Sequence, residues 1–290
     1  MRLVFVHGIN HQGHSSEWVR DEWLEALAKR LSPSDMAAVR ACDIVAPYYG
    51  DVLYEETQAA TEAGPEPIAM SVGAAEGEEQ AFLAAALNES ALALGITEQQ
   101  IEAEIASDEV QAMGFPHDRR LIALARALQA ASPLQGKVML RLIPQAFTYL
   151  KKPRARSRIN AIVEPALSDG PCIVVGHSLG SVVTFDLLRK LGRQAPFYMT
   201  IGSPLGIKAI QIALGKPLAR PTGVDYWING LDPDDFVTLG RTLTPDTFGP
   251  GIDRNVVSVD CGDDDPHDFR MYLRDPHLAE ALASAVREAK

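Results

Sequence analysis

The chain has 290 residues, of which 47% are hydrophobic and 22% charged, and its formal net charge is −11. This length and composition predict one large α/β domain, or one domain that carries an insertion. The acidic balance argues against a nucleic-acid partner, which would require a basic face.

The first residues, "MRLVFVHGIN", contain a short apolar run that is too brief for a signal peptide or a membrane span. No stretch approaches the ~20 apolar residues of a transmembrane helix. Three cysteines, Cys42, Cys172 and Cys261, are far apart and odd in number, so we expect free thiols. These features predict a cytoplasmic protein.

Six short segments are predicted to be strands: 3–6, 43–46, 172–175, 197–201, 225–229 and 256–259. They are continuous apolar or β-branched runs, which is typical of a parallel sheet that is covered on both faces. Helical patterns follow at 15–31 with Ser15 or Ser16 as the cap, at 179–191, and at 276–289 with Asp275 as the cap. This alternation predicts a doubly wound α/β fold with a mostly parallel six-stranded sheet.

The interval between the second and third strands is well over a hundred residues long, far more than one crossover needs. Helical stretches are predicted at about 74–112 and 117–131, an apolar and basic segment follows at 137–158, and a helix near 156–168 returns to the sheet. Charges in 55–79 are all acidic, and those in 137–158 are all basic. We therefore predict a core of residues 1–50 and 156–290, and a helical insertion, or lid, of residues 51–155.

The segment 137–158 has two interpretations. Its apolar residues and the basic cluster 151–158 suit an interfacial segment that makes peripheral contact with anionic lipid. The alternative is an ordinary helix that packs its apolar side on the core and keeps its charges in water, and the sequence favours this slightly.

The segment "CIVVGHSLGS" ends an apolar strand on a serine that lies between two glycines and opens a helical pattern. Gly176-His177-Ser178-Leu179-Gly180 matches G-x-S-x-G, the turn that presents a nucleophilic serine with a strained backbone. The following helix brings its free amides to the place where an oxyanion would form. The sequence therefore predicts Ser178 as a nucleophile.

A nucleophilic serine needs a base, and in this motif's chain order the acid and then the histidine follow the serine. His267 lies after the last strand, at the edge where Ser178 emerges, and is the predicted base. His277 is predicted to be a surface residue of the last helix. His11 and His14 are predicted to lie in a mobile loop near the pocket rather than to bind a metal.

At residues 1–50 and 156–290 the chain resembles serine hydrolases of the α/β-hydrolase superfamily, closest to its lipase and esterase branches. The motifs "FVHGIN", "GHSLGS", "GSPLG" and "PHDFRMYLRDPHL" carry the resemblance. Two leading strands of the full family sheet are missing, which implies a minimal core. The resemblance also implies an oxyanion hole formed by the amides of Leu179 and of Ile9 (or Asn10).

The triad acid is a choice among Asp232, Asp234 and Asp235 in the loop "GLDPDDFV". Asp232 precedes a proline and suits a turn cap, and Asp234 is predicted to be solvated. Asp235 is followed by two apolar residues that can anchor it, and the resemblance agrees, so we favour Asp235 over Asp232.

Together these features predict cleavage of a small-molecule ester or a lipid through Ser178, His267 and Asp235 and an acyl-enzyme, without a metal or organic cofactor. The same triad could serve thioester, amide or acyl transfer. A hydrolase-like binding or scaffold module without turnover is the alternative from a different class. The sequence does not indicate the oligomeric state.

Overall fold

The computed structural model describes residues 1–57, 75–107, 110, 116–167, 170–262 and 264–289. Its centre is a six-stranded sheet in which every pairing is parallel, with the order β2-β1-β3-β4-β5-β6. The strands are β1 Arg2–Val6, β2 Asp43–Val45, β3 Cys172–His177, β4 Ala195–Ile201, β5 Val224–Gly230 and β6 Arg254–Val256. The predicted α/β class and six-stranded sheet are thus confirmed, and the sheet is entirely rather than mostly parallel.

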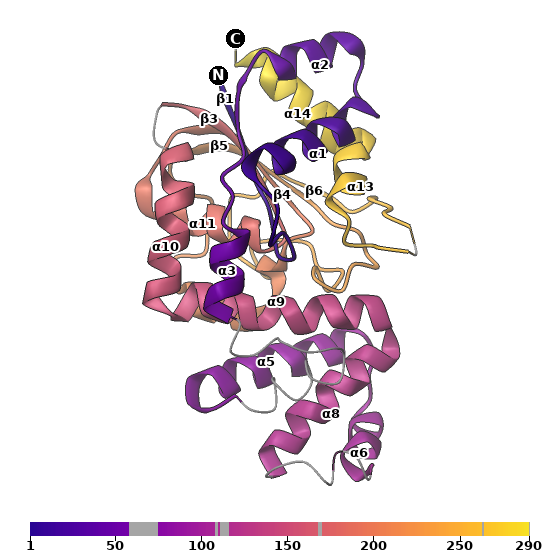
Figure 1. The fold of residues 1–290 in the computed structure, drawn as a ribbon. Helices are drawn as coiled ribbons and strands as arrows, with labels where there is room; N and C mark the ends of the chain where they lie inside the picture. Colours follow the sequence, from indigo (N-terminus) through magenta and orange to yellow (C-terminus); the bar gives the residue numbers. More distant parts are fainter. Residues whose placement is uncertain (58–74, 108–109, 111–115, 168–169, 263, 290) are drawn as a thin grey trace.

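The described helices alternate with the strands or belong to the long interval between β2 and β3 (Figure 1). They are α1 Ser16–Ala28, α2 Pro33–Arg40, α3 Gly50–Thr57, α5 Gly77–Ala93, α6 Glu98–Ala106, α8 Pro116–Ala131, α9 Pro133–Lys151, α10 Pro153–Val163, α11 Leu179–Leu191, α12 Lys208–Leu214, α13 Phe269–Arg274 and α14 Pro276–Glu288. Two 3₁₀ turns, η2 Glu164–Leu167 and η3 Pro204–Gly206, complete the set.

Helices cover both faces of the sheet, because successive side chains of a strand point to opposite sides. Leu3 and Phe5 of β1 belong to the apolar cluster that α1, α2, α13 and α14 complete. Val4 and Val6 belong to the other cluster, which contains α11 and the insertion helices. Strands that are buried on both faces explain why the sequence shows continuous apolar runs rather than alternation.

The order of the strands reverses direction at β1. The chain moves from β1 to β2 on one side, and then returns to place β3 on the other side of β1. In an open parallel sheet such a reversal leaves a crevice at the carboxyl ends of the two central strands. The segments after Val6 and His177 therefore meet at this crevice.

Local capping signals placed several helices correctly. Ser15 caps α1 by accepting the amide hydrogen of Trp18, and Asp275 caps α14. His277, in the first turn of α14, is exposed as predicted. The helix α2 was not predicted, although Ser32 caps it and a proline occupies its first turn.

Two predicted boundaries were wrong. The helical stretch 74–112 is divided into α5 and α6, because Gly95 has a left-handed φ of 70° and Thr97 begins a new helix with a capping box. Parts of that stretch, 74, 108–109 and 111–112, lie outside the described residues. The last strand ends at Val256 instead of beginning there, since Asn255 lies in the sheet and bonds Asn229 on β5.

The insertion helices lie at the end of the molecule toward which the carboxyl ends of the strands point, and α9 crosses that end (Figure 1). The apolar and basic segment 137–158 belongs to two helices, α9 and α10, and α10 begins at Pro153. Most of α9 beyond Gly136 is buried. The apolar part of 137–150 thus packs inside the protein.

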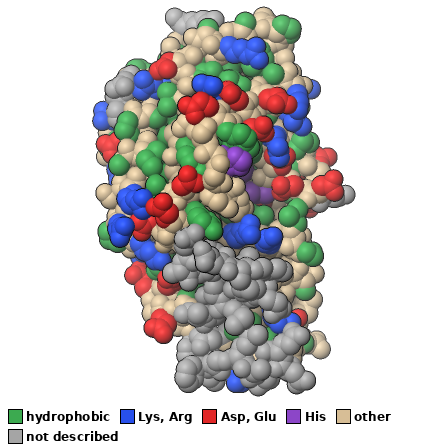
Figure 2. Space-filling model, in the orientation of Figure 1, with side chains coloured by type: hydrophobic (Ala, Val, Ile, Leu, Met, Phe, Trp, Pro, Cys, Tyr) green, Lys and Arg blue, Asp and Glu red, His purple; other side chains and the backbone are tan. Residues whose placement is uncertain are grey.

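Acidic side chains of the same chain contact the basic cluster 151–158. Lys151 and Lys152 lie 2.7 and 3.8 Å from Glu78 and Glu79 of α5. Two further arginines, Arg154 and Arg158, contact glutamates of α3. These pairings favour the packed-helix interpretation, and lipid contact stays a prediction. On the face drawn in Figure 2, charges of both signs are interspersed. No described helix is long and apolar enough to cross a membrane.

A buried carboxylate joins the returning helix α10 to α11. Asp186 is fully buried and contacts Arg156 of α10, Lys190 and Arg189 of α11, and the hydroxyl of Tyr149 on α9. Burial by itself raises the pKa of this carboxyl, but hydrogen bonds from Arg156 and Lys190 outweigh it and hold the pKa below its usual value of 3.8.

We expect Asp186→Asn to lower the free energy of unfolding by about 3 kcal/mol, because it removes the buried counter-charge that Arg156, Arg189 and Lys190 share. Since the folded-state pKa is depressed, this contribution is present above the unfolded pKa and is lost as the pH falls through the folded value. Asp43→Asn, which breaks an exposed pair with Arg2, should cost less than about 1 kcal/mol. Urea unfolding of both variants at pH 7 and pH 3 measures the difference; equal losses at pH 7 would contradict it.

Candidate active site

Ser178 stands at the turn between β3 and α11, in a backbone conformation that residues other than glycine rarely adopt. Its φ is 53° and its ψ is −130°. Close contacts explain the two flanking glycines. A Cβ on Gly176 would lie 2.7 Å from Oγ1 of Thr184, and one on Gly180 would lie 2.3 Å from the carbonyl oxygen of Val6. The turn is therefore wedged between β1 and α11, and this packing maintains the strain.

Two sets of free backbone amides face this turn. The amide of Leu179 is the first of α11, where no carbonyl of the helix can reach it, and it has no acceptor among the described residues. The loop after β1 lies against the serine, because a Cβ on Gly8 would be 2.4 Å from Cβ of Ser178. In that loop the amides of Ile9 and Asn10 also lack a described acceptor, so both remain candidates for the second donor.

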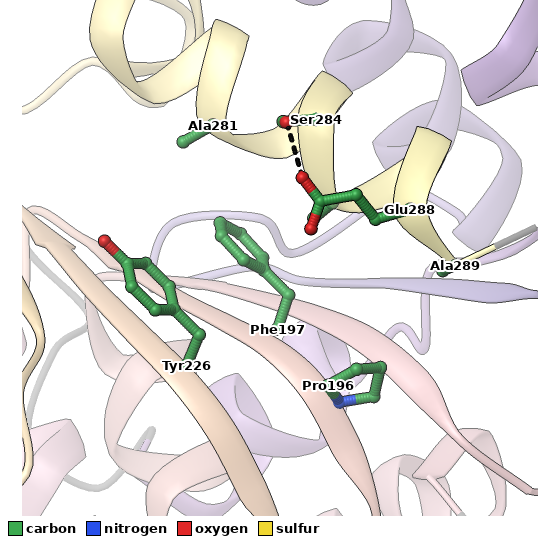
Figure 3. A pocket seen from close by; sticks show the side chains of 8 residues that line it. Pro196, Phe197, Tyr226, Ala281, Ser284, Glu288 and Ala289 are labelled. Atoms are coloured by element: carbon green, nitrogen blue, oxygen red, sulfur yellow. Dashed lines mark hydrogen bonds between the residues drawn. The ribbon is translucent and has the colours of Figure 1, made fainter.

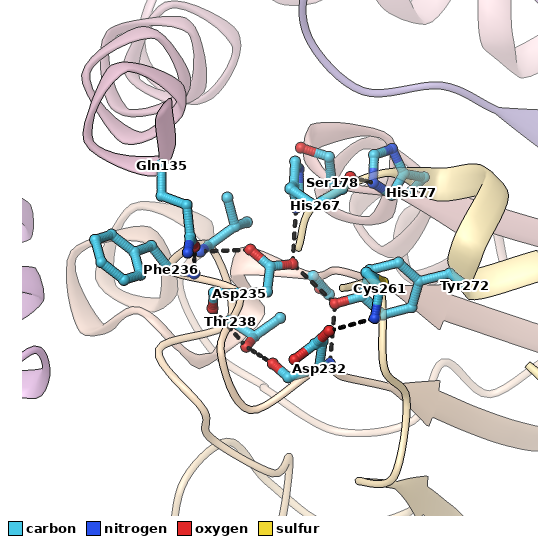
Figure 4. Close-up of polar contacts among 12 residues, drawn as sticks. Gln135, His177, Ser178, Asp232, Asp235, Phe236, Thr238, Cys261, His267 and Tyr272 are labelled. Carbon is cyan, nitrogen blue, oxygen red and sulfur yellow. Dashed lines mark hydrogen bonds and ion pairs between the residues drawn. The ribbon is translucent and has the colours of Figure 1, made fainter. Parts of the chain in front are cut away.

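His267 and Asp235 are brought together at the same edge of the sheet (Figure 4). Nδ1 of His267 donates to Oδ2 of Asp235 at 2.8 Å. Gly202, with a φ of 52°, makes room for the pair: a Cβ there would lie 3.1 Å from Cε1 of His267. The amide of Ser178 donates to the carbonyl of Ile201. The serine and the histidine thus lie against the same end of β4.

The other two aspartates of the loop have different positions. Both carboxylate oxygens of Asp232 accept backbone amides, Oδ1 from Asp234 at 2.8 Å and Oδ2 from Cys261 at 2.7 Å. Asp234 itself is exposed. Of the three aspartates, Asp235 is the one whose carboxylate forms a described hydrogen bond with the imidazole of His267. The geometry therefore favours Asp235 as the acid and Asp232 as a turn cap.

Tyr272 of α13 is a site residue that sequence reasoning missed. Its hydroxyl donates to Oδ2 of Asp235 at 2.8 Å and accepts the amide of Asp232 at 3.0 Å. The other oxygen of Asp235 accepts the amide of Val237. Burial, and then the charge of Asp235, raise the pKa of Tyr272 well above its usual value, so it stays a donor. The available signal was a tyrosine five residues after His267.

Polar atoms of the serine and of the histidine lack hydrogen-bond partners. Oγ of Ser178 and Nε2 of His267 are both buried and have no hydrogen-bond partner. Ser178 is 0% exposed and His267 8% exposed, and Figure 4 draws the two side chains beside each other. Buried polar atoms without partners are uncommon and are concentrated at functional sites. In free enzymes the hydrogen bond from the nucleophile to the base is often long and shortens only on substrate binding.

Other histidines surround the site in neutral form. His7 donates through Nδ1 to a carbonyl and accepts a backbone amide through Nε2, and His177 donates through Nε2 to the carbonyl of His267. Burial lowers the pKa of both well below the usual value, and lowers that of His11 to about 4. Contrary to the predicted mobile loop, His11 is buried, with its ring centre 4.8 Å from that of His7.

A groove of about 520 Å³ lies elsewhere, between α14 and the amino-terminal parts of β4 and β5 (Figure 3). It contains the stacked rings of Phe197 and Tyr226, and Glu288, which accepts a hydrogen bond from Ser284. Ser178 is at the carboxyl end of β3, so this groove is not part of its site. Among the described residues there is no group of three or more His, Cys, Asp or Glu side chains that could hold a metal ion.

A scan against protein-family models, a search of curated proteins and a search of solved structures each found no match to this chain. What the site does is therefore inferred from its geometry and electrostatics. The site has three main features: a serine with a strained backbone at a switch point of the sheet, free amides beside this serine, and an imidazole that a buried carboxylate orients.

Because Ser178 has a positive φ, we expect Ser178→Gly to raise the free energy of unfolding by about 1 kcal/mol, through relief of backbone strain. No hydrogen bond is lost, since Oγ has no partner. Ser284→Gly, in the regular helix α14, is the matched control and should lower stability by about 0.5–1 kcal/mol. Thermal and urea unfolding compare the two. A destabilised Ser178→Gly variant would show that the turn is unstrained.

Proposed function

We propose that the chain is a serine hydrolase that cleaves carboxylic esters through an acyl-enzyme, with Ser178 as nucleophile, His267 as base and Asp235 as acid. The observation that carries the proposal is the Asp235–His267 hydrogen bond at the edge of the sheet where the strained Ser178 turn lies. A structural serine needs neither a strained backbone nor an oriented imidazole beside it. The family resemblance of the sequence motifs supports the same activity.

In the first half-reaction, Oγ of Ser178 attacks the ester carbonyl while Nε2 of His267 takes the hydroxyl proton. Asp235 accepts Nδ1–H, which holds the ring in the tautomer that leaves Nε2 free. The amides of Leu179 and of Ile9 or Asn10 are the donors for the developing oxyanion, and such donors contribute about 2.7–4 kcal/mol each. His267 then gives its proton to the departing alcohol, and the acyl group stays on Ser178.

In the second half-reaction, water attacks the acyl-enzyme. His267 takes a proton from the water, the same amides stabilise the second oxyanion, and the proton returns to Oγ of Ser178 as the carboxylic acid leaves. Every proton is held at a side chain of the chain itself, so the proposed route needs no metal or organic cofactor.

The insertion acts as a lid in this proposal. Ser178 is fully buried, so a substrate reaches it only when the covering chain moves. One end of α9 contacts the acid loop, where Gln135 accepts the amide of Phe236 at 2.8 Å. Near its middle, Arg141 contacts Asn10 in the loop after β1. Each of these two contacts is a single hydrogen bond, which costs little to break by itself.

Thioester, amide or acyl-transfer chemistry could use the same triad, and p-nitrophenyl esters and thioesters of equal chain length would rank these substrates. A binding module without turnover is the alternative from a different class. If the chain is such a binding module, a fluorophosphonate probe does not label it and it hydrolyses no ester.

We expect Ser178→Ala and His267→Ala each to abolish hydrolysis of p-nitrophenyl butyrate, because triad members act as a unit. The fluorophosphonate probe should label the wild type and not Ser178→Ala. His277→Ala, at the exposed histidine of α14, is the matched control and should keep full activity. Turnover by Ser178→Ala at the wild-type rate would exclude this serine as the nucleophile.

The acid is tested by a second pair of variants. Asp235→Asn should lower kcat by about 10⁴, as expected when the orientation of the imidazole is lost. Asp232→Asn should mainly lower the unfolding free energy, by about 1–3 kcal/mol, because Asp232 accepts two backbone amides. The reverse pattern in kcat and urea unfolding would assign the acid to Asp232.

Tyr272→Phe removes a donor from Asp235, and so leaves more negative charge on the carboxylate that faces His267. A more negative carboxylate stabilises the imidazolium, so we expect the acid limb of the kcat/KM profile to move to higher pH, by about one unit. Tyr226→Phe, in the distant groove, should leave the profile unchanged. A loss of activity with an unmoved acid limb would assign Tyr272 a purely structural role.

A further inference from the structure

One helix of the insertion carries a polar stripe in an otherwise apolar environment. Lys137, Arg141 and Gln145 are spaced by four residues along α9, and therefore share one face of the helix. Around them, the apolar residues of α9 are buried. A polar stripe on a helix that packs into a protein needs polar surroundings, or a polar ligand.

The middle residue of the stripe, Arg141, contacts the loop that follows β1. Nη1 of Arg141 lies 3.5 Å from Oδ1 of Asn10. Asn10 follows Gly8, which lies directly against Ser178. Gln145, one turn further along α9, is 8% exposed. Figure 2 shows Lys and Arg side chains directly below histidines, at the level where α9 crosses the molecule in Figure 1.

The two cations of the stripe have no ion-pair partner among the described residues, although both are half-buried. The cations that follow on the same segment, Lys151, Lys152 and Arg158, all contact glutamates. Two like charges four residues apart repel by about 0.2–0.5 kcal/mol. The chain has a net charge of −11, so carboxylates are plentiful, yet among the described residues none forms an ion pair with either of these cations.

We propose that Lys137 and Arg141 bind an anionic group, a carboxylate or a phosphate, on the ester that Ser178 cleaves; this rests on the proposed function. The planar guanidinium of Arg141 presents two parallel donors to such a group, and the ammonium of Lys137 adds a mobile point charge. Gln145 supplies an amide donor on the same face. Binding of an anion removes the repulsion between the cations and leaves the substrate carbonyl near the loop after β1.

Paired substrates test this inference. For an anion on the acyl side, we compare p-nitrophenyl butyrate with mono-p-nitrophenyl glutarate. For an anion on the alcohol side, we compare ethyl butyrate with 2-phosphoethyl butyrate. We expect kcat/KM in the wild type to be at least tenfold higher for the anionic member of one pair, and that pair identifies the side of the ester that carries the anion.

Arg141→Gln and Lys137→Gln should each lower this ratio, anionic over neutral, about tenfold. Arg154→Gln, whose side chain is 82% exposed and lies further along the chain, is the matched control and should leave the ratio unchanged. Circular dichroism and thermal unfolding check that each variant folds.

Calorimetry with Ser178→Ala gives a readout that does not depend on turnover. This variant should bind glutarate or inorganic phosphate, and the added Arg141→Gln change should weaken binding at least tenfold. The inference is overturned if the wild type hydrolyses the anionic and the neutral ester of each pair with about equal kcat/KM and Ser178→Ala binds no anion. That result leaves the proposed function intact. No hydrolysis and no probe labelling would overturn the proposed function, while anion binding that is lost with Arg141 would still support the anion site.

Discussion

The close approach of β1 to the start of α11 is the constraint on which the rest of the site depends. A Cβ on Gly180 would lie 2.3 Å from the carbonyl oxygen of Val6, and one on Gly8 would lie 2.4 Å from Cβ of Ser178. Only glycine at these two positions allows the elements to meet. Their contact holds Ser178 in its strained conformation, and brings the first amide of α11 and the loop after β1 to the same side of the serine.

The negative charge that contacts the imidazole of His267 is the anchored carboxylate of Asp235. Asp235 is buried and accepts hydrogen bonds from an imidazole, a phenol and a backbone amide. His7 and His177 lie nearby, and burial lowers the pKa of each, so that they add no positive charge near neutral pH. A buried environment strengthens the remaining electrostatic interactions. His267 is thereby left as the group that exchanges protons with Ser178 in the proposed reaction.

Charge complementarity within the chain positions the insertion. Glutamates of α3 and α5 contact the basic segment after α9, and the buried Asp186 ties α10 to α11. These contacts use cations that could otherwise meet an anionic surface. Within α9 itself, Lys137 and Arg141 have no ion-pair partner among the described residues, and Arg141 contacts Asn10 of the loop after β1. The ion pairs that position the insertion therefore involve the cations at and beyond the end of α9.

Local patterns in the sequence were sufficient for the first five strands, for the caps Ser15 and Asp275, and for the turn at Ser178, because each depends on residues within a few positions of one another. The shift of the last strand was not predictable, since it depends on Asn255 bonding Asn229 across the sheet. The sequence limited the acid to one loop and favoured Asp235. The contact with His267 and the donor Tyr272 come from segments more than thirty residues away. Tertiary structure also decided that the basic segment meets glutamates, because charges distant in sequence become partners only when the chain has folded.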